Sequence, residues 1–81
     1  MEIHGYSNKG LAVEEIRSEP LSEITLVASP AELRKIAEFL VGAAESMERM
    51  GDTYSHEHLS DKQSGFDKSP HFVVFNPDAT S

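Results

Sequence analysis

The longest periodic pattern of hydrophobic positions in the chain runs from Ser29 to Gly51 and predicts an amphipathic helix. Ser29, Pro30 and Glu32 have the residue types of an N-cap, a first helical position and a capping box. Gly51 suits the left-handed conformation that ends a helix. Apolar side chains recur every three or four residues and so share one stripe: Leu33, Ile36, Ala37, Leu40, Ala43, Ala44, Met47 and Met50. We expect this helix to pack on a sheet, mainly through Leu33, Ile36, Leu40 and Met47.

Shorter patterns on the N-terminal side of this helix predict β-strands. Residues 2–6 and 11–16 flank a turn-forming Ser-Asn-Lys-Gly sequence, which is typical of a hairpin. Residues 18–20 end in proline and indicate a second turn. Residues 23–28 are rich in β-branched and aliphatic side chains, so we expect them to form a central strand that leads directly into the helix.

Residues beyond the helix read mostly as loop, with a short strand over residues 55–59 and a clear strand over residues 71–75. Both faces of the last strand are apolar, which predicts a position inside the sheet. The expected order is β-β-β-α-β-β: an α+β fold with an antiparallel or mixed sheet of four to five strands and one long helix on one face. The other face of this sheet is left for polar side chains or for a partner.

The length of 81 residues predicts a single domain, 1–81, with a frayed tail over residues 78–81. A domain of this size buries a small core, so association with another protein or with a second copy would help to stabilise it. A homodimer that serves as a structural module is therefore one of the functions that the sequence allows.

The net charge of −7 comes from seven Lys and Arg against fourteen Asp and Glu. Nucleic-acid binding is disfavoured because it depends on Lys and Arg contacts to phosphates. The acidity suits either solubility alone or a basic protein partner. The chain has no cysteine, and it has neither a signal-peptide pattern nor an apolar run of membrane-spanning length. We expect a cytoplasmic protein without disulfides or membrane segments.

The cluster formed by His56, Glu57 and His58, with Asp61 nearby, is the clearest candidate for chemistry. On a strand His56 and His58 share a face, where alternate histidines and a carboxylate could bind a divalent metal. Imidazole and carboxylate together would also suit acid–base catalysis. The spacing is not that of the HExxH zinc motif, and solvent-facing histidines or a partner-contact surface explain the cluster equally simply. We therefore expect no cofactor and no catalytic residue, with a metal-binding or acid–base enzyme as the alternative.

A second candidate region is the loop around Phe66 and Asp67. Phe66 stands among polar residues, where it could project into a partner as an aromatic anchor. Aromatic side chains of small domains are more often buried, so we expect Phe66 to fold back onto the core. The candidate partner-contact residues are His56, Glu57, His58, Asp61, Phe66 and Asp67.

Several stretches of the sequence resemble a family of small bacterial immunity proteins from polymorphic toxin systems, immunity protein 32. They are EITLVASPAELR at 23–34, AEFL at 37–40, HEHLSD at 56–61 and the late strand at 73–77. HEHLSD is the most distinctive of them. The resemblance implies a cytoplasmic, non-enzymatic protein that binds and neutralises a cognate toxin, and the acidic charge would agree with a basic toxin.

Overall fold

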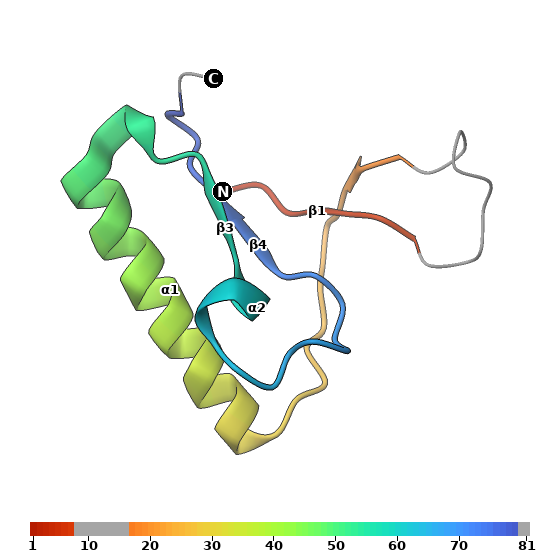
Figure 1. Ribbon diagram of the computed structural model, residues 1–81. Coiled ribbons are helices and arrows are strands. Elements are labelled where there is room, and N and C mark those ends of the chain that lie inside the picture. The colour runs from red at the N-terminus through yellow and green to blue at the C-terminus, as the bar shows by residue number, and fades with distance from the viewer. Residues whose placement is uncertain (8–16, 80–81) are drawn as a thin grey trace.

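The computed structural model describes residues 1–7 and 17–79 and has two α-helices, one 3-10 helix and two small sheets in that part of the chain (Figure 1). The elements are β1 (His4–Gly5), β2 (Glu19–Pro20), α1 (Pro30–Met50), the 3-10 helix η2 (Gly51–Thr53), β3 (His56–His58), α2 (Leu59–Lys62) and β4 (Val73–Phe75). β1 pairs antiparallel with β2, and β3 pairs antiparallel with β4. The α+β class is confirmed, but the expected single sheet of four to five strands is wrong, because the two described sheets are separate.

Helix α1 begins and ends where the sequence predicts. The Ser29 hydroxyl accepts a hydrogen bond from the Glu32 N–H at 3.2 Å, and the Glu32 carboxylate accepts one from the Ser29 N–H at 2.8 Å. The bond from the Ser29 backbone lowers the pKa of Glu32. At the other end Gly51 has a φ of 61° and its N–H donates to the Met47 carbonyl. The capping box and the glycine stop are both confirmed.

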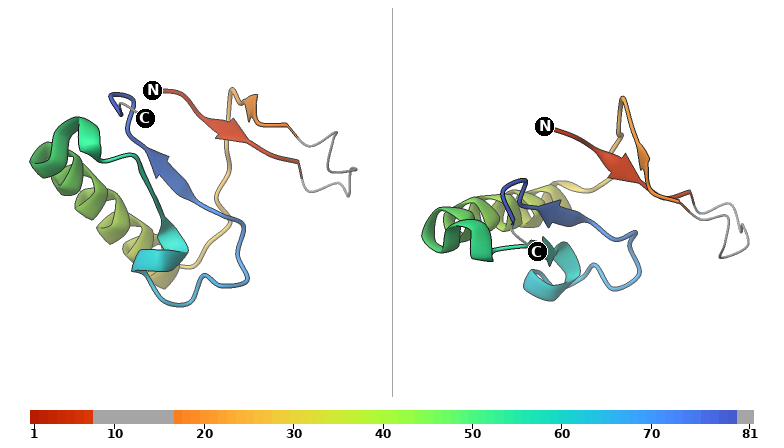
Figure 2. Two further views of the ribbon diagram at one scale, coloured as in Figure 1. Left: turned by 45° about the horizontal axis from the view of Figure 1, so that its top comes forward. Right: turned by 90° about the horizontal axis from the view of Figure 1, so that it is seen from above.

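The core lies between α1, α2 and one face of the β3–β4 sheet. α1 contributes Ile36 and Phe39, α2 contributes Leu59, and β4 contributes Val74. The rings of Phe39 and Phe72 meet edge to face with their centroids 6.2 Å apart. In both views of Figure 2 the β1–β2 ribbon lies on the far side of the β3–β4 sheet from α1. The β1–β2 ribbon is therefore not part of the sheet on which α1 packs.

Only one half of the α1 hydrophobic stripe is covered. Ile36, Phe39 and Ala43 are buried, whereas Leu33 and Leu40 keep 45% and 44% of their surface exposed. The expectation that Leu33 and Leu40 are core residues is wrong, and Phe39, which the sequence analysis left out of the stripe, lies at its buried centre. The sequence analysis expects a sheet of four to five strands under this stripe. The observed two-stranded sheet is too narrow to cover the whole stripe.

The expected central strand over residues 23–28 is absent from the described structure. These residues run as one extended stretch from β2 toward α1 (Figure 1), and Val27 is 97% exposed. High β-propensity reflects packing on a pleated surface, and no neighbouring strand supplies that surface here. Pro20 lies in β2 and pairs with His4 of β1, although the sequence predicts only a turn there. Proline is tolerated in an edge strand, where its missing N–H is not needed.

The two strands expected after α1 are confirmed as β3 and β4. β4 pairs only with β3 among the described strands, so its expected place inside a larger sheet is wrong. The expected strand over residues 11–16 lies outside the described residues. Of the expected frayed tail, residues 78–81, the structure describes only residues 78 and 79.

Gly42 lies in the middle of α1, where no atom approaches within 4 Å of the position that an added Cβ would occupy. We predict that Gly42→Ala raises the free energy of unfolding by about 0.5–1 kcal/mol, because alanine loses less backbone entropy in a helix. Urea denaturation followed by circular dichroism measures the change. Gly51→Ala is the control and should lower stability by about 1–2 kcal/mol, because its φ is positive. Equal effects of the two substitutions would contradict the prediction.

Candidate functional site

The face of the β3–β4 sheet that points away from α1 brings together histidine, aromatic and aliphatic side chains. The register pairs His56 with Phe75 and His58 with Val73, and directly opposed residues of antiparallel strands share a face. His56, Phe75 and Val73 are exposed, with Phe75 at 65%. We call the surface formed by His56, His58, His71, Val73 and Phe75 the histidine face.

Rings follow one another along the histidine face at contact distance. His56 stacks on Phe75 with centroids 5.1 Å apart and planes 9° from parallel. His56 and His58 meet edge to face at 5.5 Å, and His58 and His71 do so at 5.8 Å. Each side chain is thereby restrained by a neighbour while part of its surface stays accessible. Such rigid, exposed aromatic groups suit contact with another molecule at a low cost in side-chain entropy.

Neighbouring polar groups hold the ends of the cluster. The Ser55 hydroxyl and His56 Nδ1 are joined by a hydrogen bond of 3.1 Å. Glu57 points to the opposite face of the sheet, where its carboxylate lies 3.9 Å from Lys62 Nζ. The Tyr54 hydroxyl is buried close to the Glu57 carboxylate. Burial is the main cause that raises the pKa of Tyr54, and the Glu57 charge raises it further.

Phe66 lies in the core with 6% of its surface exposed, so the expectation that it folds back is confirmed and its ring is not a surface anchor. Two contacts to α1 hold this loop. Lys35 Nζ donates to the Ser64 carbonyl at 2.9 Å, and Gln63 Nε2 donates to the Glu38 carboxylate at 3.3 Å. Both contacts come from residues just before Phe66, so they fasten that side of the loop to α1.

The two acidic candidates remain on the surface. Asp61 is exposed on α2, and Asp67 is exposed on the loop that follows Phe66. In the part of the chain that the structure describes, no three His, Cys, Asp or Glu side chains are arranged to hold a metal ion. The geometry therefore gives the metal alternative for His56, His58 and Asp61 no support.

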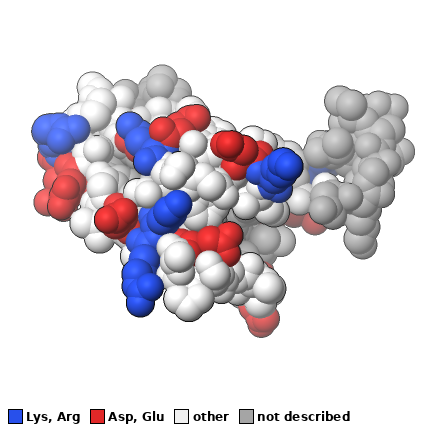
Figure 3. Space-filling view, turned by 60° about the horizontal axis from the view of Figure 1, so that its bottom comes forward, with Lys and Arg blue, Asp and Glu red and all other residues white. Residues whose placement is uncertain are grey.

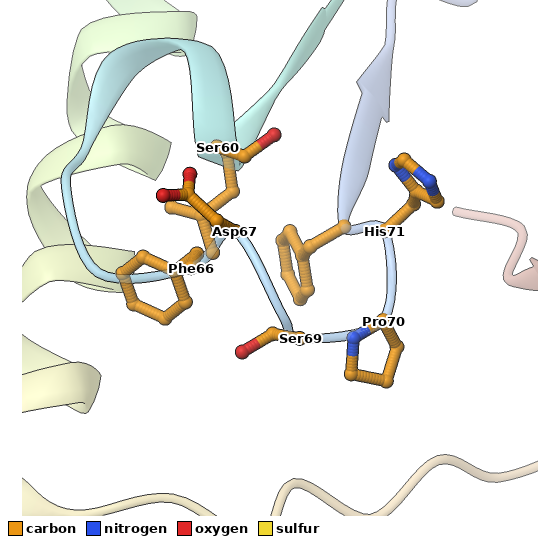
Figure 4. A pocket seen from close by; sticks show the side chains of 8 residues that line it. Ser60, Phe66, Asp67, Ser69, Pro70 and His71 are labelled. Atoms are coloured by element: carbon orange, nitrogen blue, oxygen red, sulfur yellow. The ribbon is translucent and has the colours of Figure 1, made fainter.

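A small hollow beside α2 gathers residue types that are also found in hydrolases. Ser60, Asp67, Ser69 and His71 line it, together with Phe72 and other neighbours (Figure 4). The Asp67 carboxylate and the His71 ring point away from each other in this view. The hollow measures about 30 Å³, which is of the order of one water molecule. It has neither the size nor the convergent groups of an active site.

Asn76 is a structural residue that the sequence analysis missed. It is buried, and its amide nitrogen donates to the Gly51 carbonyl at 3.1 Å and to the Tyr54 carbonyl at 2.9 Å. Its amide oxygen accepts from the Asp78 N–H at 3.0 Å. Asn76 thus fixes the end of β4 against the start of β3. An asparagine directly before a proline indicates a turn, and no pattern in the sequence shows which carbonyls it reaches.

Charged side chains of both signs are interspersed on one face of the molecule (Figure 3). On the face shown in Figure 3, acidic and basic side chains lie among one another without a region of one sign. The histidine face itself contains no Asp, Glu, Lys or Arg. None of the described helices is both long enough and apolar enough to cross a membrane.

A family model described as immunity protein 32 matches residues 23–77, which is more than half of the chain. The matched region begins with the extended stretch before α1 and continues to the residue after Asn76, so it contains the whole histidine face and the core. It leaves out β1 and β2. The curated proteins and the solved structures that were compared with the chain give no match.

Proposed function

Because the chain belongs to the immunity protein 32 family, we propose that it binds a cognate toxin directly and holds it inactive. Membership of the family is the observation that carries this proposal, and it indicates a non-enzymatic role. An inhibitor of this kind needs a surface complementary to its target and no reactive group of its own. The action takes place in the cytoplasm of the cell that the protein defends.

The histidine face and the acidic residues beside it are the contact surface in this proposal. Aromatic side chains anchor protein interfaces because they bury a large area with few rotatable bonds. His56 and His58 supply such rings here, and both can donate or accept hydrogen bonds at the rim of an interface. Asp61 and Asp67 follow on the adjoining α2 and loop. Phe66 is not part of this surface because it is buried.

The net charge of −7 favours a basic toxin as the partner. Opposite net charges accelerate encounter and orient the two proteins before contact, and this effect weakens as salt screens it.

We predict that the variant with His56, His58, Asp61 and Asp67 all replaced by alanine binds the toxin at least tenfold more weakly than the native protein. The cause is loss of two aromatic contacts and two steering charges, and one hot-spot residue alone can be worth about 2 kcal/mol. The toxin is first identified as the protein that co-purifies from the cell of origin. Calorimetry then measures the affinity, and survival of cells that express the toxin measures protection.

The matched control replaces Glu45 and Glu48 by alanine. Both are exposed on α1, so this variant also loses two negative charges and keeps the histidine face. It should keep protection and most of its affinity. Full protection by the quadruple variant, with its helical circular dichroism intact, would refute this surface. A co-purified protein that is not a toxin would refute the proposed function.

A further inference from the structure

Residues 23–28 run extended and have the composition of a β-strand, but they pair with no other described residue. Residues 24–28 carry no charge and are mostly β-branched or aliphatic, and Leu26 and Val27 are exposed. Residues 23–28 make no backbone hydrogen bond with the other described residues. A row of free N–H and C=O groups on an apolar extended segment is a template for pairing with another strand.

The free edge of β4 is a complementary template. Hydrogen bonds from the Leu59 N–H to the Phe72 carbonyl and from the Asn76 N–H to the Ser55 carbonyl fix which β4 residues bond to β3. Because such pairs alternate along an antiparallel ladder, the N–H and C=O groups of Val73 and Phe75 point away from β3. No third strand covers that edge in the described structure.

We propose that two copies of this chain form a dimer in which residues 23–28 of each copy add as a strand to the β4 edge of the other. In the described part of each chain, residues 23–28 and the outer edge of β4 are both unpaired, so a two-fold axis satisfies both at once and closes the assembly. Each β3–β4 sheet gains a third strand. The expected strand over residues 23–28 is then formed between chains.

The absence of charge from the two pairing segments allows a second copy as the occupant. Two chains of net charge −7 repel each other, and the repulsion is least where the meeting surfaces are uncharged. Residues 24–28 and residues 69–77 contain no Asp, Glu, Lys or Arg. The β3 edge is less suitable because it carries Glu57 with its Lys62 partner.

The extent of the family supports the same pairing. The family model begins at residue 23 and includes both the unpaired strand and β4, whereas β1 and β2 lie outside it. A strand that belongs to the family region is therefore expected to find its partner within that region. Among the described strands of that region, β4 offers the uncharged edge.

Sedimentation equilibrium of the full chain, without toxin, tests the proposal from micromolar to near-millimolar concentration. We expect a monomer–dimer equilibrium that Leu26→Glu weakens at least tenfold by placing a charge in the added strand. Val41→Glu is the matched control, because Val41 is an exposed apolar residue on α1, outside both pairing elements. Val41→Glu should weaken the dimer only slightly, through the repulsion of one more negative charge on each chain. A monomer at every concentration, or equal weakening by both variants, would overturn the proposal.

Salt and hydrogen exchange give two further readouts. The dimer should strengthen as sodium chloride rises, because salt screens the repulsion between two acidic chains, whereas binding to a basic protein should weaken. The amide protons of residues 24–28 should be protected only at concentrations where the dimer forms. Protection of these amides in the monomer would show pairing within one chain and overturn the proposal. A monomeric protein that still binds its toxin would overturn the dimer and leave the proposed function standing.

Discussion

Phe39→Ala is expected to lower the free energy of unfolding by about 3–5 kcal/mol, the usual cost of removing a buried phenylalanine ring. Phe39 is 3% exposed and sits edge to face on Phe72 at the centre of the core. Small domains have roughly 5–15 kcal/mol of stability in total, and a chain of this size belongs near the lower end. A large fraction of the variant should therefore be unfolded at 37 °C. Urea denaturation followed by circular dichroism measures the effect.

Leu40→Ala is the control for this prediction, because Leu40 is the next residue of α1 and lies on the uncovered half of its stripe. Its replacement should cost no more than about 1 kcal/mol. If Leu40→Ala proved as costly as Phe39→Ala, α1 would be rotated from the orientation in the structure, toward the stripe that the sequence predicts.

Asn76→Asp is expected to lower the free energy of unfolding by about 3 kcal/mol at neutral pH, although the side chain keeps its shape. A carboxylate cannot donate to the Gly51 and Tyr54 carbonyls, and it places a buried negative charge beside both oxygens. The new carboxyl should have a pKa raised above that of the unfolded chain. The deficit should therefore shrink as the pH falls through the carboxyl range, since the protonated group can donate one hydrogen bond.

Urea titrations of this variant and of the native protein at pH 7 and pH 4.5 measure both effects. Gln63→Glu is the matched control: it makes the same amide-to-acid change at a side chain whose one hydrogen bond, to Glu38, is exposed. It should cost less than about 1 kcal/mol. An Asn76→Asp variant as stable as the control would mean that the Asn76 hydrogen bonds do not hold the two chain segments together.

The local features of this fold could be predicted from the sequence because neighbouring residues determine them. Ser29, Pro30 and Glu32 make the start of α1 from contacts within one turn, and Gly51 makes its end in the same way. The β-branched and aromatic side chains of residues 71–75 correctly predict a strand there, β4. The burial of Phe66 follows from the cost of exposing an aromatic ring.

The predictions that were wrong concern features that depend on which element packs against a segment. The stripe of α1 is apolar over both Phe39 and Leu40, and only the narrow width of the β3–β4 sheet decides which of them is buried. Residues 23–28 have the composition of a central strand, but no other described residue pairs with them. β-propensity measures how well a side chain packs on a pleated sheet, but it does not show that a neighbouring strand is present.

The candidate site also has features that the sequence predicts and features that it does not. That His56 and His58 share a face follows from their spacing on a strand. That Phe75 stacks on His56 and that His71 meets His58 depends on the register between β3 and β4, which joins residues far apart in the sequence. The carbonyl partners of Asn76 depend on the same register.

The separation of the β1–β2 ribbon from the rest of the fold has a consequence for cooperativity. None of the described ribbon residues belongs to the buried core, and the ribbon is held by its own ladder and a hydrogen bond from Leu21 to Ile3. Its opening and closing can therefore be a local equilibrium of low free energy, uncoupled from global unfolding. Local opening of the ribbon would leave α1 and the histidine face folded.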